Sequence, residues 1–269
     1  MPDEAALESL VEAVQANRKY ANITAALVTR LAADALDRGL QDKAAIKDVR
    51  NKLHQVGGAY FKQTPKFGAA EAAISALPQD LSAPEVQTFC RKQMQAHAST
   101  AERLPILTEF FQTCLAPVAP VHSVLDLACG LNPLALPWMP LADDFSYQAF
   151  DIYLDMLGLV DAFLRHFSPS SRAFAYDLVA GSPQVPAQVA FLLKTIPCLE
   201  QVDKQIGTSL LQSIQAEHIL VSFPAKSLGG RNKGMPDFYR DHFHALIKGQ
   251  PWLVQEFTFA TEIAFLVSK

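Results

Sequence analysis

The stretch Ser123-Val-Leu-Asp-Leu-Ala-Cys-Gly-Leu-Asn-Pro133 joins a short apolar run to a glycine turn. Residues 123–128 are mostly apolar, which is typical of a buried strand in a parallel sheet. Gly130 then gives the chain the freedom to turn sharply out of that strand. Because parallel α/β sheets bind ligands across the carboxyl ends of their strands, Asp126 and Gly130 stand where a ligand would lie.

Downstream of this stretch, strand and helix patterns alternate. Strands are expected at 147–151, 172–177, 189–193 and 218–222, and helices at 154–166, 199–215 and 238–247. The last two apolar runs, 254–260 and 263–267, are separated by so few residues that they must pair as antiparallel neighbours. The pattern predicts an α/β fold with a doubly wound, mostly parallel sheet.

Upstream of the stretch, apolar residues recur at helical spacing. Helices are expected at 5–16, 24–36, 42–56, 84–97 and 100–113. The change of rhythm divides the chain into an α-helical N-terminal module, residues 1–105, and an α/β domain, residues 106–269.

The composition excludes several classes of protein. Half of the 269 residues are apolar, which supports a sizeable buried core. The four cysteines are far apart and the histidines lack ligand spacing, so no disulfide frame and no metal site are expected. The acidic start does not resemble a signal peptide, and no apolar run is long enough to cross a membrane. A cytoplasmic protein without membrane contact is expected.

Charge is unevenly distributed. The net charge is −4, but residues 18–66 hold ten Lys or Arg against four Asp. A basic segment on an otherwise acidic chain indicates a surface for a polyanion.

Acidic residues end the first three predicted strands at intervals of about 25 residues: Asp126, Asp151 and Asp177. A carboxylate that ends the second strand is suited to accept both hydroxyl protons of a ribose, and one that ends the third could accept from an adenine amino group. The alternative is that these residues are helix N-caps that follow strands.

The glycine turn distinguishes between nucleotide ligands. A dinucleotide fold would carry G-x-G-x-x-G, so that backbone amides approach a pyrophosphate. Here Gly130 is the single glycine of the turn, and it is followed by Asn132 and Pro133. This favours a nucleoside without phosphates, of which S-adenosylmethionine is the common example.

Three longer motifs resemble one enzyme family. They are Asp126-Leu-Ala-Cys-Gly-Leu-Asn-Pro-Leu-Ala135, His97-Ala-Ser-Thr-Ala-Glu-Arg103 and Val221-Ser-Phe-Pro-Ala-Lys-Ser-Leu-Gly-Gly-Arg-Asn-Lys-Gly-Met235. All three are similar to motifs of the aminoglycoside-resistance 16S rRNA (guanine(1405)-N(7))-methyltransferases, and the similarity extends from about Lys19 to the C-terminus. The resemblance implies a class I S-adenosylmethionine-dependent methyltransferase fold. It also implies methylation of a decoding-site guanine and resistance to 4,6-disubstituted deoxystreptamine aminoglycosides.

The resemblance also implies a cofactor site. Its residues would be Tyr60, His97, Ala98, Ser99, Thr100, Arg103, Gly130, Asp151, Asp177, Leu178 and Leu193. Arg103 would offer a two-pronged donor to the cofactor carboxylate, while Ser99 and Glu102 have the spacing of a capping box that opens a helix. Guanine N7 carries no proton, so no general base and no catalytic residue beyond positioning is expected.

The basic residues would then contact rRNA. Candidates are Lys19, Lys47, Arg50 and Lys52 in the helical module and Lys226, Arg231 and Lys233 in a glycine-rich loop that could also be simply solvated. Such contacts to phosphates fix position and carry little sequence information. The resemblance implies 16S rRNA in the assembled 30S subunit as the substrate. A monomeric enzyme is expected.

Two other functions remain open: a methyltransferase for a small molecule, with the helical module as a lid, or a non-catalytic rRNA-binding protein on the same fold. Steep salt dependence of substrate binding would count against the first. Absence of cofactor binding would favour the second. Cys129 could be a nucleophile, but a small buried side chain is the simpler interpretation.

Overall fold

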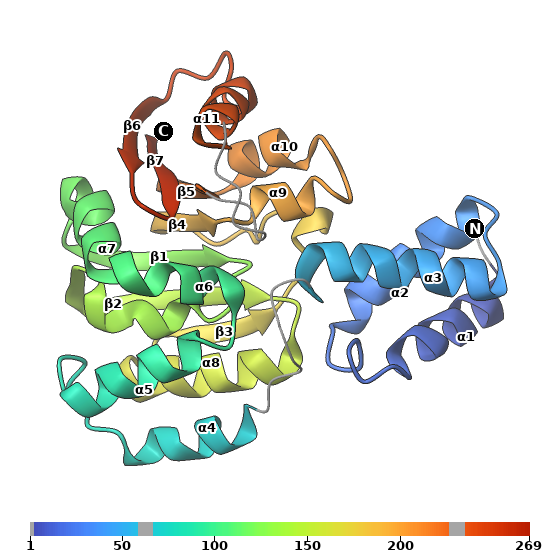
Figure 1. The fold of residues 1–269 in the computed structure, drawn as a ribbon, viewed down its shortest axis with the longest axis horizontal. Coiled ribbons are helices and arrows are strands. Elements are labelled where there is room, and N and C mark those ends of the chain that lie inside the picture. Colours follow the sequence, from blue (N-terminus) through green and yellow to red (C-terminus); the bar gives the residue numbers. More distant parts are fainter. Residues whose placement is uncertain (1–2, 59–66, 226–234) are drawn as a thin grey trace.

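A seven-stranded sheet forms the centre of the protein (Figure 1). The structure is a computed structural model that describes residues 3–58, 67–225 and 235–269. The strand order is β3-β2-β1-β4-β5-β7-β6. The strands are β1 (Val121–Leu127), β2 (Leu141–Asp151), β3 (Arg172–Ala175), β4 (Ala187–Leu193), β5 (Ala216–Pro224), β6 (Leu253–Thr258) and β7 (Glu262–Ser268).

Strand direction confirms the predicted doubly wound sheet. The strands β1 to β5 pair in parallel, whereas β7 lies antiparallel to both β5 and β6. Asp126 of β1 stands beside Ala149 of β2 and Phe191 of β4. The carboxyl ends of these three strands therefore meet at one edge of the sheet.

Helices cover both faces of the sheet (Figure 1). The helices α4 (Gly68–Ala73), α5 (Pro84–Met94), α7 (Leu107–Leu115) and α8 (Leu154–Phe167) belong to one face. The helices α9 (Ile196–Leu199), α10 (Ile206–Ser213) and α11 (Met235–Leu246) cover the other. Each face thus buries its own apolar core, as expected for this fold class.

Two predicted helices are broken in the structure. In place of the predicted helix 100–113, the chain forms α6 (Ala98–Arg103), a 3-10 turn Leu104–Ile106 and α7, because Pro105 lacks the amide that a continuous helix requires. The predicted helix 199–215 is likewise wrong. The Asp203 carboxylate accepts a hydrogen bond from the Gln205 amide at 2.9 Å, which makes a turn between α9 and α10.

The first three helices form a lobe beside the strand ends (Figure 1). They are α1 (Glu4–Gln15), α2 (Ala25–Asp37) and α3 (Asp42–Leu53), and they pack around buried residues such as Val14, Leu31 and Val49. In contrast, α4 and α5 lie against the sheet side of the molecule, α4 in contact with α8. A domain boundary at residues 105 and 106 stays a prediction.

Backbone contacts attach this lobe to the loop that follows β2. Ile23 forms an antiparallel bridge with Tyr153. The Thr24 amide donates to the Ile152 carbonyl, and the Leu154 amide donates to the Asn22 carbonyl, both at 2.8 Å. The lobe is therefore fixed next to the carboxyl end of β2. In the described part of the chain, no helix is long and apolar enough to cross a membrane.

Candidate active site

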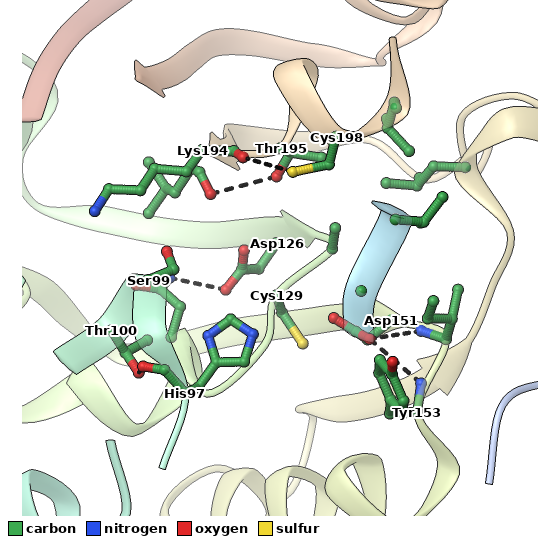
Figure 2. Close-up of a pocket in the computed structure, with 18 of the residues that line it drawn as sticks. His97, Ser99, Thr100, Asp126, Cys129, Asp151, Tyr153, Lys194, Thr195 and Cys198 are labelled. Carbon is green, nitrogen blue, oxygen red and sulfur yellow. Dashed lines mark hydrogen bonds between the residues drawn. The ribbon is translucent and has the colours of Figure 1, made fainter. Parts of the chain in front are cut away.

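A pocket opens at the carboxyl ends of β1, β2 and β4 (Figure 2). The space within it, counted together with the open solvent at its mouth, is about 780 Å³. Eight of the predicted cofactor residues line it: His97, Ser99, Thr100, Arg103, Asp151, Asp177, Leu178 and Leu193. Ala98 and Gly130 lie beside lining residues in the chain, and Tyr60 is outside the described residues.

Asp151 ends β2 with its carboxylate held by backbone amides. One oxygen accepts from the Gly130 amide at 2.9 Å, and the other accepts from Ile152 at 2.7 Å and Tyr153 at 3.3 Å. Burial raises the pKa of Asp151, and these amides act in the opposite direction. The side chain is thus a fixed acceptor at the pocket, as a ribose diol would require (Figure 2).

Gly130 has no room for a side chain. Its φ is +52°, and a Cβ built there would lie 2.9 Å from Cε1 of His97. His97 is partly buried at the pocket. Desolvation there lowers its pKa to about 3, with Arg103 and Lys194 acting in the same direction. The turn therefore brings bare backbone against a neutral imidazole at the pocket wall.

A buried polar network begins at Asp126. Its Oδ2 accepts from the Tyr147 hydroxyl at 2.6 Å and from the Asn132 side-chain amide at 2.9 Å. Burial raises the pKa of Asp126 to about 6, while these two donors act to lower it. Asn132 in turn accepts from Nη1 of Arg103 at 3.0 Å, so the network reaches α6.

Arg103 continues this network to the C-terminal hairpin. Its Nε lies 2.8 Å from Oε1 of Glu262, and Nη2 donates to Oε2 at 2.9 Å. Both side chains are fully buried. Burial by itself would raise the pKa of Glu262, but Arg103 and Lys194 lower it overall. Two nitrogens of the Arg103 guanidinium thus contact Glu262. The contact of Arg103 with a cofactor carboxylate stays a prediction.

Lys194 is a second buried cation at the pocket. Its Nζ lies 2.7 Å from Glu102 and 3.4 Å from Glu262. Sequence reasoning missed Lys194, Glu262 and Tyr147. The one available signal was a charged residue inside an otherwise apolar run, as for Lys194 after β4 and Glu262 at the start of β7.

The capping box predicted from Ser99 and Glu102 is wrong. The N-cap of α6 is His97, and it makes no side-chain capping bond. Ser99 and Thr100 lie inside the first turn, where the Thr100 hydroxyl donates to the Met94 carbonyl at 2.7 Å. The Glu102 carboxylate pairs with Nζ of Lys194 at 2.7 Å instead, because a buried cation left without a partner is costly.

Asp177 is an N-cap, as the alternative interpretation of the acidic residues expected, and it also lines the pocket. It precedes the 3-10 turn Leu178–Ala180 and accepts from the Val179 amide at 3.0 Å. Its carboxylate also accepts a hydrogen bond from Nε of Arg30 at 2.6 Å. Leu178 and Leu193 are both at least nine-tenths buried and provide apolar wall.

The predicted RNA contacts are only partly described. Lys226, Arg231 and Lys233 lie outside the described residues. Lys19 and Lys47 are exposed on the helical lobe. Arg50 instead donates to the Ala13 carbonyl at 2.6 Å and ties α3 to α1, while Lys52 lies 3.6 Å from Asp48. All seven roles in RNA binding stay predictions.

Cys129 has the surroundings of a buried thiol. It is 4% exposed, and burial, with Asp151 and Asp126 adding to the effect, raises its pKa well above the ordinary value. A thiolate nucleophile is thereby disfavoured. Among the described ranges, no group of His, Cys, Asp and Glu is arranged to hold a metal ion.

These residues fit an adenosyl group. Gly130 presents backbone where a Cβ would be blocked, Asp151 presents a fixed carboxylate, and Leu178 and Leu193 present apolar surface. A ribose diol and an adenine ring need these three kinds of surface, and the single glycine leaves no cradle for a pyrophosphate.

Comparisons with known proteins agree with this geometry. The family described as "Ribosomal RNA methyltransferase (FmrO)" matches residues 16–267. A 16S rRNA (guanine(1405)-N(7))-methyltransferase from Micromonospora echinospora is 34% identical over 98% of this chain and 97% of the relative. One of the same description from Serratia marcescens is 30% identical over 98% of both chains.

Solved structures give the same result. The crystal structure of the 16S rRNA methyltransferase RmtF in complex with S-adenosyl-L-homocysteine superposes with a TM-score of 0.81, at 30% identity over 100% of both chains. The 16S rRNA methylase RmtB superposes with a TM-score of 0.79, at 26% identity over 98% of both chains. The chain therefore belongs to the FmrO family of ribosomal RNA methyltransferases.

Proposed function

We propose that this protein methylates N7 of guanine 1405 in 16S rRNA, with S-adenosylmethionine as the methyl donor. The observation that carries the proposal is the Asp151 carboxylate, fixed by the Gly130 amide at 2.9 Å, in a pocket at the strand ends. The family match over residues 16–267 and the two curated relatives of that activity support the choice of target.

Methylation of guanine N7 requires no proton transfer by the protein. Guanine N7 has a lone pair and no proton and lies on the major-groove edge of the base. S-adenosylmethionine supplies an already electrophilic methyl group. The protein then has to orient the base and exclude water, which is a problem of position rather than of acid–base catalysis.

The pocket residues are suited to this task. Asp151 would accept from the ribose hydroxyls and Asp177 from the adenine amino group, while Leu178 and Leu193 exclude water. His97 is neutral around pH 7 because burial lowers its pKa to about 3, so it adds no charge that would repel a sulfonium. Arg103, with Ser99 and Thr100, would face the methionine end.

The substrate would be the assembled 30S subunit. The exposed Lys19 and Lys47 on the helical lobe, within the module 1–105, would contact rRNA phosphates. The enzyme would act as a monomer in the cytoplasm, where ribosomes lie. A methylated, positively charged guanine in the decoding site would then obstruct 4,6-disubstituted deoxystreptamine aminoglycosides.

Expression in a susceptible bacterium tests this proposal. Growth on gentamicin with continued sensitivity to apramycin is expected, together with borohydride–aniline cleavage of 16S rRNA at guanine 1405. The Asp151→Ala variant should lose both effects. Gentamicin sensitivity and an uncleaved guanine, with the protein present at normal levels, would overturn the proposal.

A further inference from the structure

An arginine of the helical lobe reaches into the proposed adenine site. Nε of Arg30, on α2, lies 2.6 Å from Oδ2 of Asp177, and Nη2 donates to Oδ1 at 3.3 Å. Asp177 is 8% exposed and Arg30 is 27% exposed, so water screens this pair only in part. Two residues 147 positions apart are thus joined by a two-pronged ion pair.

Tight docking of the lobe fixes the position of Arg30. The bridge between Ile23 and Tyr153 lies just before α2, so the start of this helix is held by the sheet domain. The Tyr153 ring also packs so closely on Gly57 that a Cβ there would lie 2.6 Å from it. Arg30 therefore approaches Asp177 on a helix that is anchored beside the pocket.

The pair leaves Asp177 able to bind a further donor. A carboxylate has about four lone-pair sites. Arg30 occupies one on each oxygen, and the Val179 amide occupies a second one on Oδ1. An acceptor site therefore remains on Oδ2, and the guanidinium fork stops the carboxylate from rotating.

We propose that Arg30 is a positioning residue of the cofactor site, which orients the Asp177 carboxylate toward the adenine amino group. The inference rests on the proposed function, because it takes Asp177 as the adenine acceptor. It gives the helical lobe a role beyond RNA binding, since a residue outside the α/β domain would tune the affinity and base selectivity for the cofactor.

Ligand binding, measured by isothermal titration calorimetry, tests this role without turnover. Arg30→Ala should weaken S-adenosylhomocysteine binding about tenfold, a loss of about 1.4 kcal/mol, whereas Arg30→Lys should recover part of it. Arg38→Ala is the matched control, because Arg38 pairs with Asp48 inside the lobe, away from the pocket. It should bind within twofold of the wild type.

Base selectivity separates positioning from a structural effect. S-inosylhomocysteine carries an oxygen in place of the adenine amino group. The wild type should prefer the adenosyl ligand, and Arg30→Ala should lose most of that preference. Equal weakening of both ligands, or an unchanged preference in both Arg30 variants, would overturn the inference.

The Asp177→Asn variant distinguishes a wrong role for Arg30 from a wrong assignment of Asp177 as the adenine acceptor. If Asp177→Asn loses the preference and the Arg30 variants keep it, only the role of Arg30 falls. If Asp177→Asn also keeps it, the adenine assignment falls with it. Cleavage at guanine 1405 reports on the proposed activity independently of both results.

Discussion

At the residue scale, Asp151 is the proposed acceptor for the ribose of the cofactor. Asp151→Asn should weaken S-adenosylhomocysteine binding roughly 30-fold or more, because bonds to a charged acceptor contribute ~1.5–3 kcal/mol each. Titration calorimetry below the unfolding temperature measures this. Asp144→Asn, on the same strand but with an 85% exposed side chain, is the control and should bind as the wild type does. Equal affinity of the two variants would contradict the assignment.

His97 makes stability depend on pH. Its folded-state pKa is lowered to about 3, mainly by burial, from an ordinary 6.5. As the pH falls below 6.5, the unfolded chain takes up a proton that the folded chain refuses, so stability is lost. Between pH 7 and pH 5 the wild type should lose about 2 kcal/mol more than His97→Gln.

Urea unfolding of both proteins at several pH values measures this difference. Asp126, whose folded-state pKa is raised to about 6, has the opposite effect on stability. Below about pH 6 its carboxyl group binds a proton in the folded chain before it does so in the unfolded chain, so a fall in pH stabilises the fold. Since Asp126 is present in both proteins, its contribution cancels. A wild-type curve parallel to that of His97→Gln would show that His97 is not held neutral.

At the element scale, the β6–β7 hairpin contributes a buried charge to the active site. Glu262 opens β7 and lies between Arg103 and Lys194, fully buried. Glu262→Gln should destabilise the fold by about 3 kcal/mol, because two buried cations lose their shared partner. The control Glu256→Gln, on β6 in a half-exposed pair with Arg240, should cost under about 1 kcal/mol. Similar losses in both variants would refute a special role for Glu262.

Elements were predictable where local pattern decides them. Apolar runs and their spacing gave the strands, and the short final connection gave the antiparallel hairpin. The helices over 100–113 and 199–215 were misjudged because apolar periodicity continues across each break. The signals that end them, Pro105 and the turn at Asp203, were local and could have been recognised.

The residues of the site also differ in how far the sequence predicts them. Asp151 and Asp177 were predictable, because parallel strands end at one edge of the sheet. The partners of Arg30, Tyr147 and Glu262 were not predictable, since each lies elsewhere in the chain. The separation is 147 positions for Arg30 and Asp177, 21 for Tyr147 and Asp126, and 159 for Arg103 and Glu262. Packing of whole elements creates these pairs, and neither composition nor periodicity encodes it.

At the scale of the whole molecule, the lobe's charge should govern binding to the ribosome. The double variant Lys19→Gln/Lys47→Gln should weaken 30S binding and reduce the slope of log affinity against log salt by about 1–2. Filter binding at several salt concentrations measures this. A control that removes two exposed cations elsewhere, Arg165→Gln/Lys248→Gln, should leave the slope unchanged. Equal slopes for both double variants would refute a specific RNA contact by the lobe.

One pocket should hold the methyl donor while the protein presents guanine 1405 to it. Purified 30S subunits incubated with the protein and S-adenosylmethionine, then digested and read by mass spectrometry, test this most directly. One added methyl group is expected, at N7 of guanine 1405, and none with Asp151→Asn under the same conditions. An unmodified guanine 1405, or a methyl group on another nucleotide, would contradict it.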